Sequence, residues 1–535
     1  MILETTCPFQ DDIFDEIRLF LPSAEINENE DLRIIHNYSF KNQIIINEIE
    51  IIDKTTTKFA SKQEMNVFCS ELEEKKLLKR EVKLAFYNAL SEHFNEIKPW
   101  GCLTGIRPTR LAYEFLLQGH DINDIKKYFT DTFLVREDKA ELVKSVVENQ
   151  VGIVRGDNLI NLYINIPFCP TRCSYCSFVA FDMKNNEELL REYLANLIKE
   201  LIETKKLIKE KQYKINSIYI GGGTPTTLSA KMLDELLTNI DFEVKEFTVE
   251  CGRPDTITKE KFDVLKKHNV TRICINPQTF KDETLLLIGR KHTGADTLKA
   301  YELAQNYNFS INMDLIAGLP NENFADFEST LDKTILLNPS SITVHTLSIK
   351  NGSFLANKVI VDDASIEKMV DFARNKLEKN GYYPYYLYRQ KHQLSCQENV
   401  GYCKKGKTCR FNIESMEETN TILACGAGGI TKRVFNNENR IERCANLKNV
   451  QLYIKNIDEV IMKKFNFFNN GQKGETNEND WTIISSRNNG KNENRISLRC
   501  RCCIFCWKKI WFKGICRQFW WKRNGWGDWV CSFTK

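Results

Sequence analysis

Three cysteines within eight residues, Cys169, Cys173 and Cys176, are the side chains of this chain best suited to metal chemistry. Their spacing is C-x3-C-x2-C. Three thiolates do not easily complete a structural zinc site, which usually takes four protein ligands. They can hold three corners of a [4Fe–4S] cluster and leave the fourth iron open to a further ligand. The spacing therefore predicts an iron–sulfur site, and the alternative is three loop cysteines without chemical function.

The elements that must position these cysteines form a regular alternation. An alternating run rich in β-branched residues at 162–166 predicts a strand that ends at Pro167, just before the cysteines. Further strands are expected at 217–220, 246–251, 272–276, 310–316 and 341–347, and helices at 186–209, 230–240, 259–268, 296–306 and 325–337. Strand alternating with helix predicts a parallel sheet, and six such units predict a partial barrel with its site at the carboxyl ends of the strands.

Polar motifs follow several of these strands at the point where a barrel carries its site. The glycine run 221–223 with Thr224 follows the second strand and lets the backbone approach a ligand closely. Glu250 ends the third strand, and Gln278 follows the fourth. A carboxylate at that end of a barrel points into the mouth, where it can accept hydrogen bonds from a cofactor.

Two charged residues leave alternatives open. Asp314 lies inside an otherwise apolar strand and needs a partner, and a structural ion pair with Arg290 would supply one. Arg290 is equally suited to grip a carboxylate of a cofactor or substrate. Arg107, in the loop 100–109, is expected to bridge to a neighbouring helix, and binding of an acidic ligand is the alternative.

From residue 163 to about 320 these motifs resemble the radical S-adenosylmethionine (SAM) enzymes, and within them oxygen-independent coproporphyrinogen III oxidase and its paralogues. The loop 100–109 is similar to the longer, dehydrogenase-like form of that family. The resemblance covers roughly residues 100–465. It implies an α/β fold: a partial (β/α)6 radical-SAM barrel with an α+β amino-terminal region and a mixed carboxy-terminal region.

The resemblance also implies the roles of particular residues. Cys169, Cys173 and Cys176 would bind the [4Fe–4S] cluster, and Tyr163, Gln278 and Arg290 would be catalytic. Contacts with one or two SAM molecules would come from Tyr163, Tyr175, Gly222, Gly223, Thr224, Glu250, Gln278, Arg290, Asp314 and Ile430. Cys396, Cys403 and Cys409 are more loosely spaced and are expected to bind no cluster, although a second cluster there is an alternative.

The implied reaction is decarboxylation of the propionates of coproporphyrinogen III to vinyl groups by a SAM-derived 5′-deoxyadenosyl radical. Reduced flavodoxin or ferredoxin would donate the electron. The propionates need cationic partners, for which Arg389, Lys391 and Arg107 are candidates with solvent exposure as the alternative.

Two residues depart from the family pattern. Asn165 stands where a histidine is frequent, and Phe178 stands where well-characterised oxidases carry a further cysteine. Phe178 favours the haem-chaperone branch, in which His345 or His392 would be a candidate haem ligand. A radical SAM enzyme that acts on another tetrapyrrole is a third possibility.

Length and composition place these motifs in a large chain of ordinary make-up. The 535 residues carry a net charge of +4, too small to argue for nucleic acid binding. The chain shows no apolar stretch that approaches a membrane span and no secretory signal at its start, so a cytoplasmic monomer is expected. Expected domains are an amino-terminal region at 1–155, the barrel at 156–350 and a substrate-covering region at 351–468. In the amino-terminal region we expect a hairpin around Lys41 and Asn42, and apolar residues at helical spacing predict a helix over 62–96.

The segment 469–535 has a different character. Seven of the eight tryptophans and six cysteines gather there without apolar periodicity. We interpret it as a sequence translated out of frame or as a disordered tail, because its local sequence pattern fits neither helix nor strand and no functional advantage offsets this. A second metal site at Cys500, Cys502, Cys503 and Cys506 is the alternative.

Overall fold

The computed structural model describes residues 1–22, 32–65, 70–105, 107–150, 152, 156, 158–176, 181–182, 186–348, 363–390, 394–438 and 440–469, and the backbone of four short strands beyond them. The chain divides into two compact units, Met1–Lys464 and Phe465–Lys535, each described here by itself. All the residues that the sequence singles out for chemistry, apart from the cysteines of the tail, belong to the first unit.

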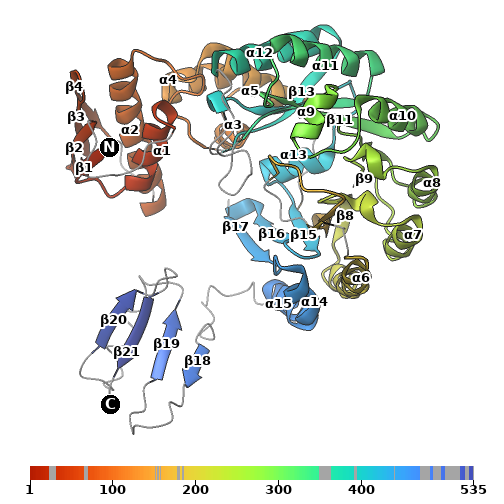
Figure 1. Ribbon diagram of the computed structural model, residues 1–535. Coiled ribbons are helices and arrows are strands. Elements are labelled where there is room, and N and C mark those ends of the chain that lie inside the picture. The colour runs from red at the N-terminus through yellow and green to blue at the C-terminus, as the bar shows by residue number, and fades with distance from the viewer. Residues whose placement is uncertain are drawn as a thin grey trace. The chain divides into compact units, whose positions relative to one another are not determined.

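Six parallel strands form the centre of the first unit and confirm the expected barrel (Figure 1). They lie in the sheet in chain order: β5 (Leu159–Ile166), β8 (Lys214–Gly222), β9 (Glu246–Glu250), β10 (Arg272–Cys274), β11 (Ser310–Ala317) and β12 (Ser341–Thr346). The connecting helices are α6 (Glu187–Glu210), α7 (Ala230–Thr238), α8 (Lys259–Lys267), α9 (Asp282–Leu287), α10 (Gly294–Gln305) and α11 (Phe324–Leu337). The carboxyl ends of all six strands therefore meet at one edge.

Local sequence explains where the barrel helices begin and which side they bury. Thr293 and Asn323 each accept a hydrogen bond from the third helical residue in a reciprocal capping box, at the starts of α10 and α11. A cap of this kind stabilises a helix by about 1 kcal/mol. In α7, Met232, Leu233, Leu236 and Leu237 fall on one side and are buried, as an amphipathic helix against a sheet requires.

Strands from the region after residue 380 extend the same sheet at both edges. Beyond β12 lie β14 (Asn399–Cys403) and β13 (Tyr383–Tyr388), both antiparallel to their neighbours. At the other edge β15 (Thr421–Cys425) pairs in parallel with β5 and continues into the hairpin β16 (Ile430–Phe435) and β17 (Arg440–Ala445). The helices after β12 are α12 (Asp363–Lys379), α13 (Arg410–Glu417), α14 (Val450–Lys455) and α15 (Ile457–Asn469).

The amino-terminal region combines a small sheet with helices. Its strands are β1 (Ile2–Thr5), β2 (Arg33–Lys41), β3 (Ile44–Ile52) and β4 (Thr56–Glu64), and its helices are α1 (Gln10–Phe20), α2 (Glu71–Phe94), α3 (Pro108–Leu117), α4 (Ile125–Phe133) and α5 (Glu137–Asn149). The expected hairpin at Lys41–Asn42 is confirmed. The helix expected from residue 62 was placed too early, because residues up to Glu64 pair with β3 as β4.

One apolar core joins this region to the barrel. Buried side chains of α2 and α5, such as Phe86 and Val143, belong to the same cluster as Leu331 of α11, Met369 of α12 and Tyr402 of β14. The amino-terminal region is thus packed against the β12–β14 side of the sheet.

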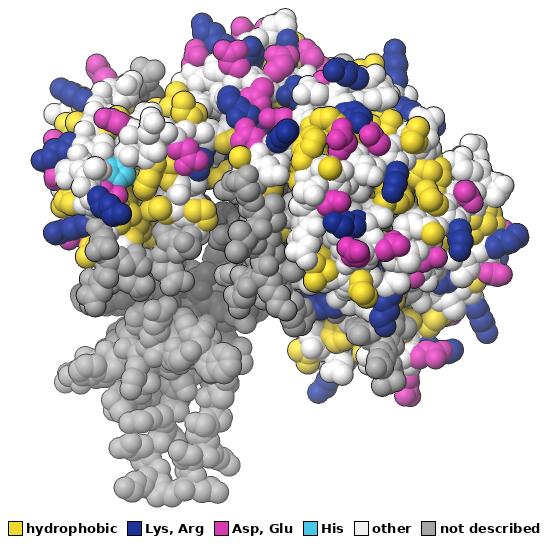
Figure 2. Space-filling model, turned by 45° about the horizontal axis from the view of Figure 1, so that its top comes forward, with side chains coloured by type: hydrophobic (Ala, Val, Ile, Leu, Met, Phe, Trp, Pro, Cys, Tyr) yellow, Lys and Arg dark blue, Asp and Glu magenta, His cyan; other side chains and the backbone are white. Residues whose placement is uncertain are grey.

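The surface of the first unit is mixed in charge. On the face shown in Figure 2, Lys and Arg side chains are interspersed with Asp and Glu. None of the described helices is both long and apolar enough to span a bilayer.

The second unit contains four antiparallel strands, β18 (Thr482–Ser485), β19 (Ile496–Cys500), β21 (Trp529–Phe533) and β20 (Phe519–Arg523), in that order. Cys502, Cys503 and Cys506 lie outside the described residues. The interpretation of this segment as aberrant text stays a prediction.

Candidate active site

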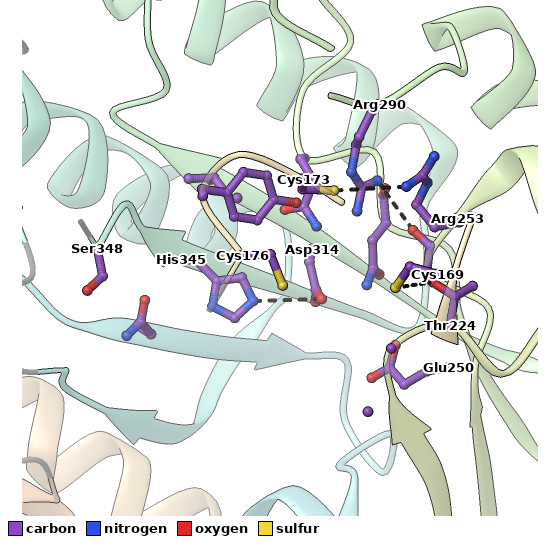
Figure 3. Close-up of a pocket in the computed structure, with 18 of the residues that line it drawn as sticks. Cys169, Cys173, Cys176, Thr224, Glu250, Arg253, Arg290, Asp314, His345 and Ser348 are labelled. Atoms are coloured by element: carbon purple, nitrogen blue, oxygen red, sulfur yellow. Dashed lines mark hydrogen bonds and ion pairs between the residues drawn. The ribbon is translucent and has the colours of Figure 1, made fainter. Parts of the chain in front are cut away.

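The three cysteines lie on one short loop after β5, pinned on both sides to neighbouring segments (Figure 3). Cys169 ends the two-residue strand β6 (Phe168–Cys169), which pairs with β7 (Phe181–Asp182). The Thr224 N–H donates to the Phe168 carbonyl over 2.7 Å, and the Ser174 N–H donates to the Ile288 carbonyl over 3.0 Å. The loop is therefore fixed between the glycine run and the α9–α10 connection.

The donor set of this loop fits a cluster better than a single ion. Among the described residues, no three His, Cys, Asp or Glu side chains converge as one metal ion would require. In a [4Fe–4S] cube each thiolate binds a different iron, so three sulfurs need not converge on one point. Burial raises the pKa of the Cys169 thiol to about 11, and ligation to iron is what would hold it as the thiolate.

An arginine that the sequence analysis did not single out supports the same loop. Arg253 is buried, and its fork donates to both Asp255 oxygens, over 3.0 and 2.9 Å. Its remaining nitrogen donates to the Thr171 carbonyl over 3.2 Å and lies 3.9 Å from the Cys173 sulfur. A fixed positive charge beside the loop would offset the negative charge of a thiolate-ligated cluster.

The glycine run at the end of β8 makes a tight passage beside the cysteines. A Cβ on Gly223 would lie 2.5 Å from the Phe168 carbonyl oxygen and 2.9 Å from that of Ile166. Gly222 has a φ of +103°, and a Cβ there would meet the Asn165 side chain. The Thr224 hydroxyl lies 3.4 Å from the Cys169 sulfur. Only glycine fits at these two positions, as the sequence predicted for a close backbone approach.

Glu250, at the end of β9, and Asp314, in β11, line the same cavity, and their pKa values are shifted in opposite directions. Burial, with repulsion from Asp314, raises the pKa of Glu250 to about 7, and Tyr219 donates a hydrogen bond to this carboxyl. Burial alone would raise the pKa of Asp314, but His345 and Asn312 hold it below its ordinary value. Two nearby carboxyls with pKa values pushed apart share the proton unequally, with the proton on Glu250.

The suggested ion pair between Asp314 and Arg290 is wrong. Asp314 instead accepts from the Asn312 amide over 2.7 Å and lies 3.7 Å from His345 Nε2. Arg290 donates to the carbonyls of Asn276 and Gly252, over 2.6 and 3.3 Å. His345, the second-last residue of the adjacent strand β12, lies near Asp314 because β11 and β12 pair in parallel, with Ile316 opposite His345.

Three buried polar atoms at this cavity have no hydrogen-bond partner within the described part of the chain: Gln278 Oε1, Arg290 Nε and Asn276 Oδ1. An unpaired buried polar atom costs about 1–3 kcal/mol, so each of them indicates a polar ligand. Gln278 also has a φ of +65°, an uncommon conformation that a non-glycine residue adopts at a functional turn. These orphaned atoms and the glycine passage fit a cofactor rich in amino, carboxylate and hydroxyl groups, as SAM is.

The cavity itself has a volume of about 380 Å³ and gathers nearly all the predicted residues. It is lined by Tyr163, Cys169, Cys173, Tyr175, Cys176, Gly222, Gly223, Thr224, Glu250, Gln278, Arg290 and Asp314. We call the side formed by the loop 169–176 with Gly222, Gly223 and Thr224 the cysteine wall. The same cavity is also lined by His345, Tyr388, Gln390 and Asn399, which we call the histidine wall.

Some candidate residues lie away from this cavity. Ile430 is not among its lining residues and is 42% exposed at the start of β16. Arg107 pairs with Glu418, just after α13, over 2.6 Å, which confirms the expected bridge to a neighbouring helix. Arg389 is buried and donates to the Cys396 carbonyl over 3.3 Å. Phe178, Lys391 and His392 lie outside the described residues.

The remaining cysteines in question are dispersed in ordinary surroundings. Cys403 is buried in β14, Cys409 lies at the start of α13 with Glu246 within 3.4 Å, and Cys396 is half-buried. None of the three lines the cavity.

Sequence reasoning missed Tyr388, Gln390 and Asn399, and it weighed His345 only as a haem ligand. They lie in β12, β13 and β14 or beside them, and the antiparallel pairing of β13 and β14 brings them to the cavity. No motif marks that pairing in the sequence. Arg253 could have been predicted from the sequence, because it follows Glu250 by three residues and so lies just after the end of a barrel strand.

Comparison with known proteins agrees with this site. The model of the Radical SAM superfamily matches residues 163–334. The chain is 36% identical, over 76% of its own length and 84% of the relative's, to the oxygen-independent coproporphyrinogen-III oxidase-like protein HemZ of Bacillus subtilis (strain 168). It is 31% identical to the heme chaperone HemW of Buchnera aphidicola subsp. Schizaphis graminum (strain Sg), over 46% of this chain and 67% of that one.

Among solved structures, coproporphyrinogen III oxidase (HemN) from Escherichia coli, a radical SAM enzyme, aligns with 57% of this chain and 71% of its own, at 20% identity and a TM-score of 0.47. The family's cofactors are a [4Fe–4S] cluster and SAM, and the residues of the cavity fit both. The chain belongs to the radical SAM superfamily and, within it, to the family of the oxygen-independent coproporphyrinogen-III oxidase-like proteins.

Proposed function

We propose that this protein catalyses oxygen-independent oxidative decarboxylation of coproporphyrinogen III, converting propionate side chains to vinyl groups in haem biosynthesis. The observation that carries the proposal is a single cavity lined both by the complete cysteine wall and by the polar histidine wall. The cysteine wall has the groups that would hold the cluster and approach SAM, and the histidine wall offers hydrogen-bonding groups to a further molecule. The similarity to a coproporphyrinogen-III oxidase-like protein over most of its length supports this choice of substrate.

In this proposal Cys169, Cys173 and Cys176 hold the cluster, and the chain's other residues orient the reactants. When bound, the cluster and SAM would supply the abstraction of one hydrogen atom from a propionate; release of CO2 and transfer of the remaining electron to an external one-electron acceptor would leave a vinyl group. Glu250 at the end of β9, Gln278 after β10 and Arg290 in the α9–α10 connection present polar groups to SAM, so that its position is fixed. Tyr163, stacked against Phe411 at 5.9 Å, closes the apolar side and excludes water.

Reduced flavodoxin or ferredoxin would supply the electron to the cluster, and the protein would act in the cytoplasm as a monomer. We infer that the cavity takes one SAM molecule, because the cysteine wall, Glu250, Gln278 and Arg290 all line it. Ile430, implied as a further SAM contact, would need a second molecule outside this cavity.

A haem-binding chaperone is the second candidate, favoured by the similarity to several proteins named heme chaperone HemW, at 28–31% identity. His345 is a poor haem ligand as it stands. Its Nδ1 lies 3.1 Å from the Tyr388 hydroxyl, and its Nε2 lies 3.7 Å from Asp314. Both ring nitrogens are engaged, so binding of iron would require one contact to break.

Anaerobic incubation of the reconstituted protein with SAM, reductant and coproporphyrinogen III separates the two candidates. Formation of vinyl-bearing product together with 5′-deoxyadenosine supports the oxidase. Stoichiometric haem binding without any turnover would instead support the chaperone. Turnover of a different tetrapyrrole alone would show that coproporphyrinogen III is not the substrate.

We further propose that the segment after residue 469 makes no contribution to this reaction. Its cysteines and tryptophans have no counterpart in the site chemistry, and it belongs to a separate compact unit. Resequencing the gene around the codons for Phe465 to Gly474 tests the out-of-frame interpretation. An alternative frame that reads as an amphipathic helix would support it, and metal bound by Cys500–Cys506 in the purified protein would contradict it.

A further inference from the structure

A buried cluster around Glu398 connects the amino-terminal region to the histidine wall. Trp100 Nε1 donates to one Glu398 oxygen over 2.9 Å, and Lys139 Nζ donates to the other over 2.8 Å. Lys139 also donates to Asp371 over 3.0 Å. The side chains of Lys139 and Glu398 are 2% and 1% exposed. Both oxygens of this carboxylate are thus held by residues that lie about 260–300 positions earlier in the chain.

The cluster sits where the two edge strands of the wall are connected. Glu398 directly precedes β14, and Arg389 directly follows β13. The Arg389 guanidinium lies 5.2 Å from the centre of the Trp100 ring and donates to the Leu103 carbonyl. The Trp100 indole therefore contacts residues at both ends of the connection between β13 and β14.

A chain of short contacts leads from Glu398 into the cavity. Thr346, at the end of β12, donates from its hydroxyl to the Glu398 carbonyl and from its N–H to Asn399 Oδ1, both over 2.9 Å. The Asn399 amide donates to the Tyr388 carbonyl over 3.4 Å. The Tyr388 hydroxyl in turn lies 3.1 Å from His345 Nδ1. Movement of Glu398 would thus displace the backbone that carries three of the four residues of the histidine wall.

The loop of the cysteine wall is instead held by residues of the barrel itself, Thr224, Ile288 and Gly289. Trp100, Lys139 and Glu398 do not line the cavity. A disturbance at Glu398 reaches one wall directly and the other only through the whole barrel.

We propose that Trp100 and Lys139 are positioning residues: through Glu398 they fix the histidine wall and so set the binding of the tetrapyrrole, while SAM binding depends on the barrel alone. The identity of the tetrapyrrole rests on the proposed function. The amino-terminal region then forms part of the active-site architecture without touching the reactants.

The test uses the full chain with its cluster reconstituted and three variants: Trp100→Phe, Lys139→Met and Glu398→Gln. We expect the KM for coproporphyrinogen III and the Kd for coproporphyrin III to rise about tenfold, as loss of a charge-assisted hydrogen bond would produce. Iron content, the Kd for SAM and SAM cleavage without tetrapyrrole should stay within about twofold of the unmodified protein. Trp100→Phe retains most of the buried ring, so it remains informative should Lys139→Met fail to fold.

Arg110→Met is the matched control. Arg110 also joins the amino-terminal region to the later chain, because its guanidinium donates to the Glu417 carbonyl over 2.7 Å, but neither residue lines the cavity. It should lower the melting temperature without raising the KM. Equal rises of KM in the control and in Trp100→Phe would show that only overall stability is involved, and the proposal would fail.

A second measurement does not depend on the substrate. Carbethoxylation of His345 by diethyl pyrocarbonate, followed by mass spectrometry, reports on its contact with Tyr388. We expect labelling to be several-fold faster in Trp100→Phe and unchanged in Arg110→Met. Unchanged labelling in all variants overturns the positioning role, whatever the substrate. Faster labelling in a protein that binds no tetrapyrrole would uphold the positioning role and contradict the proposed function instead.

Discussion

The cysteine wall and the histidine wall border the same cavity but are assembled from different parts of the chain. The cysteine wall comes from two short runs, 169–176 and 222–224, each directly after a parallel strand of the barrel. The histidine wall combines the end of β12 with residues of β13 and β14, and a cluster from the amino-terminal region supports it. The difference teaches that the chemistry shared by a superfamily is carried locally, whereas substrate binding depends on contacts between distant segments.

The largest effect should follow from removal of a cluster ligand in the cysteine wall. Each of Cys169→Ala, Cys173→Ala and Cys176→Ala should abolish SAM cleavage and the bound iron, because three thiolates hold the cube. Iron analysis and 5′-deoxyadenosine formation measure this. Cys396→Ala is the control and should retain both, since Cys396 does not line the cavity. Full iron content in any of the first three variants would refute the ligand assignment.

Gly223→Ala should come next. The new methyl group would lie 2.5 Å from the Phe168 carbonyl oxygen, and backbone on both sides has little room to move. We expect loss of most SAM binding, measured by equilibrium dialysis, with part of the iron retained. Gly105→Ala, where the nearest atom is 3.9 Å away, provides the control. Equal SAM affinities in the two variants would show that the glycine passage does not serve the cofactor.

Replacement of Glu250 should have a smaller effect, on SAM affinity and on the pH dependence of stability. Glu250→Gln should weaken SAM by about one to two decades, the value of a hydrogen bond to a charged group. Burial and Asp314 raise the pKa of Glu250 from 4.5 to about 7, so the folded state holds this proton more tightly than the unfolded chain. The free energy of unfolding contributed by Glu250 is therefore greatest at low pH and falls as pH rises from about 4.5 to about 7.

Melting temperatures across that pH range measure the effect. The fall should be reduced in Glu250→Gln, which cannot ionise, and should persist in Glu283→Gln, an exposed carboxyl outside the cavity. Identical pH profiles in the unmodified protein and Glu250→Gln would show that Glu250 is ionised throughout.

His345→Gln should give the smallest effect and the clearest separation of the two walls. Loss of its contacts with Tyr388 and Asp314 should raise the KM for coproporphyrinogen III about fivefold to tenfold, with SAM affinity and iron unchanged. Tyr388→Phe should act in the same direction, and the double variant should be less than additive because the two residues share one contact. A loss of SAM affinity in His345→Gln would mean that the two walls act as one site.

The sequence by itself determined the barrel and most of the cysteine wall. Hydrophobic periodicity placed the six parallel strands, because each strand and helix has an apolar pattern of its own period. The cysteine wall consists of two short runs, each at the carboxyl end of a strand, so the spacing of the cysteines and the strand pattern were enough to predict it. Asp314, Glu250 and Gln278 could be placed at one mouth because parallel strands end on the same side.

Only the tertiary structure decided the rest. The partner of Asp314 is His345 and not Arg290, because the register of β11 and β12 selects the neighbour. Strand β4 was missed where helix was expected, since pairing with β3 overrides a weak local preference. Glu398 meets Trp100 and Lys139 across more than 250 residues, and no local pattern records a contact of that kind. The histidine wall is therefore a product of packing, because its residues are brought together only when the distant segments fold onto the barrel.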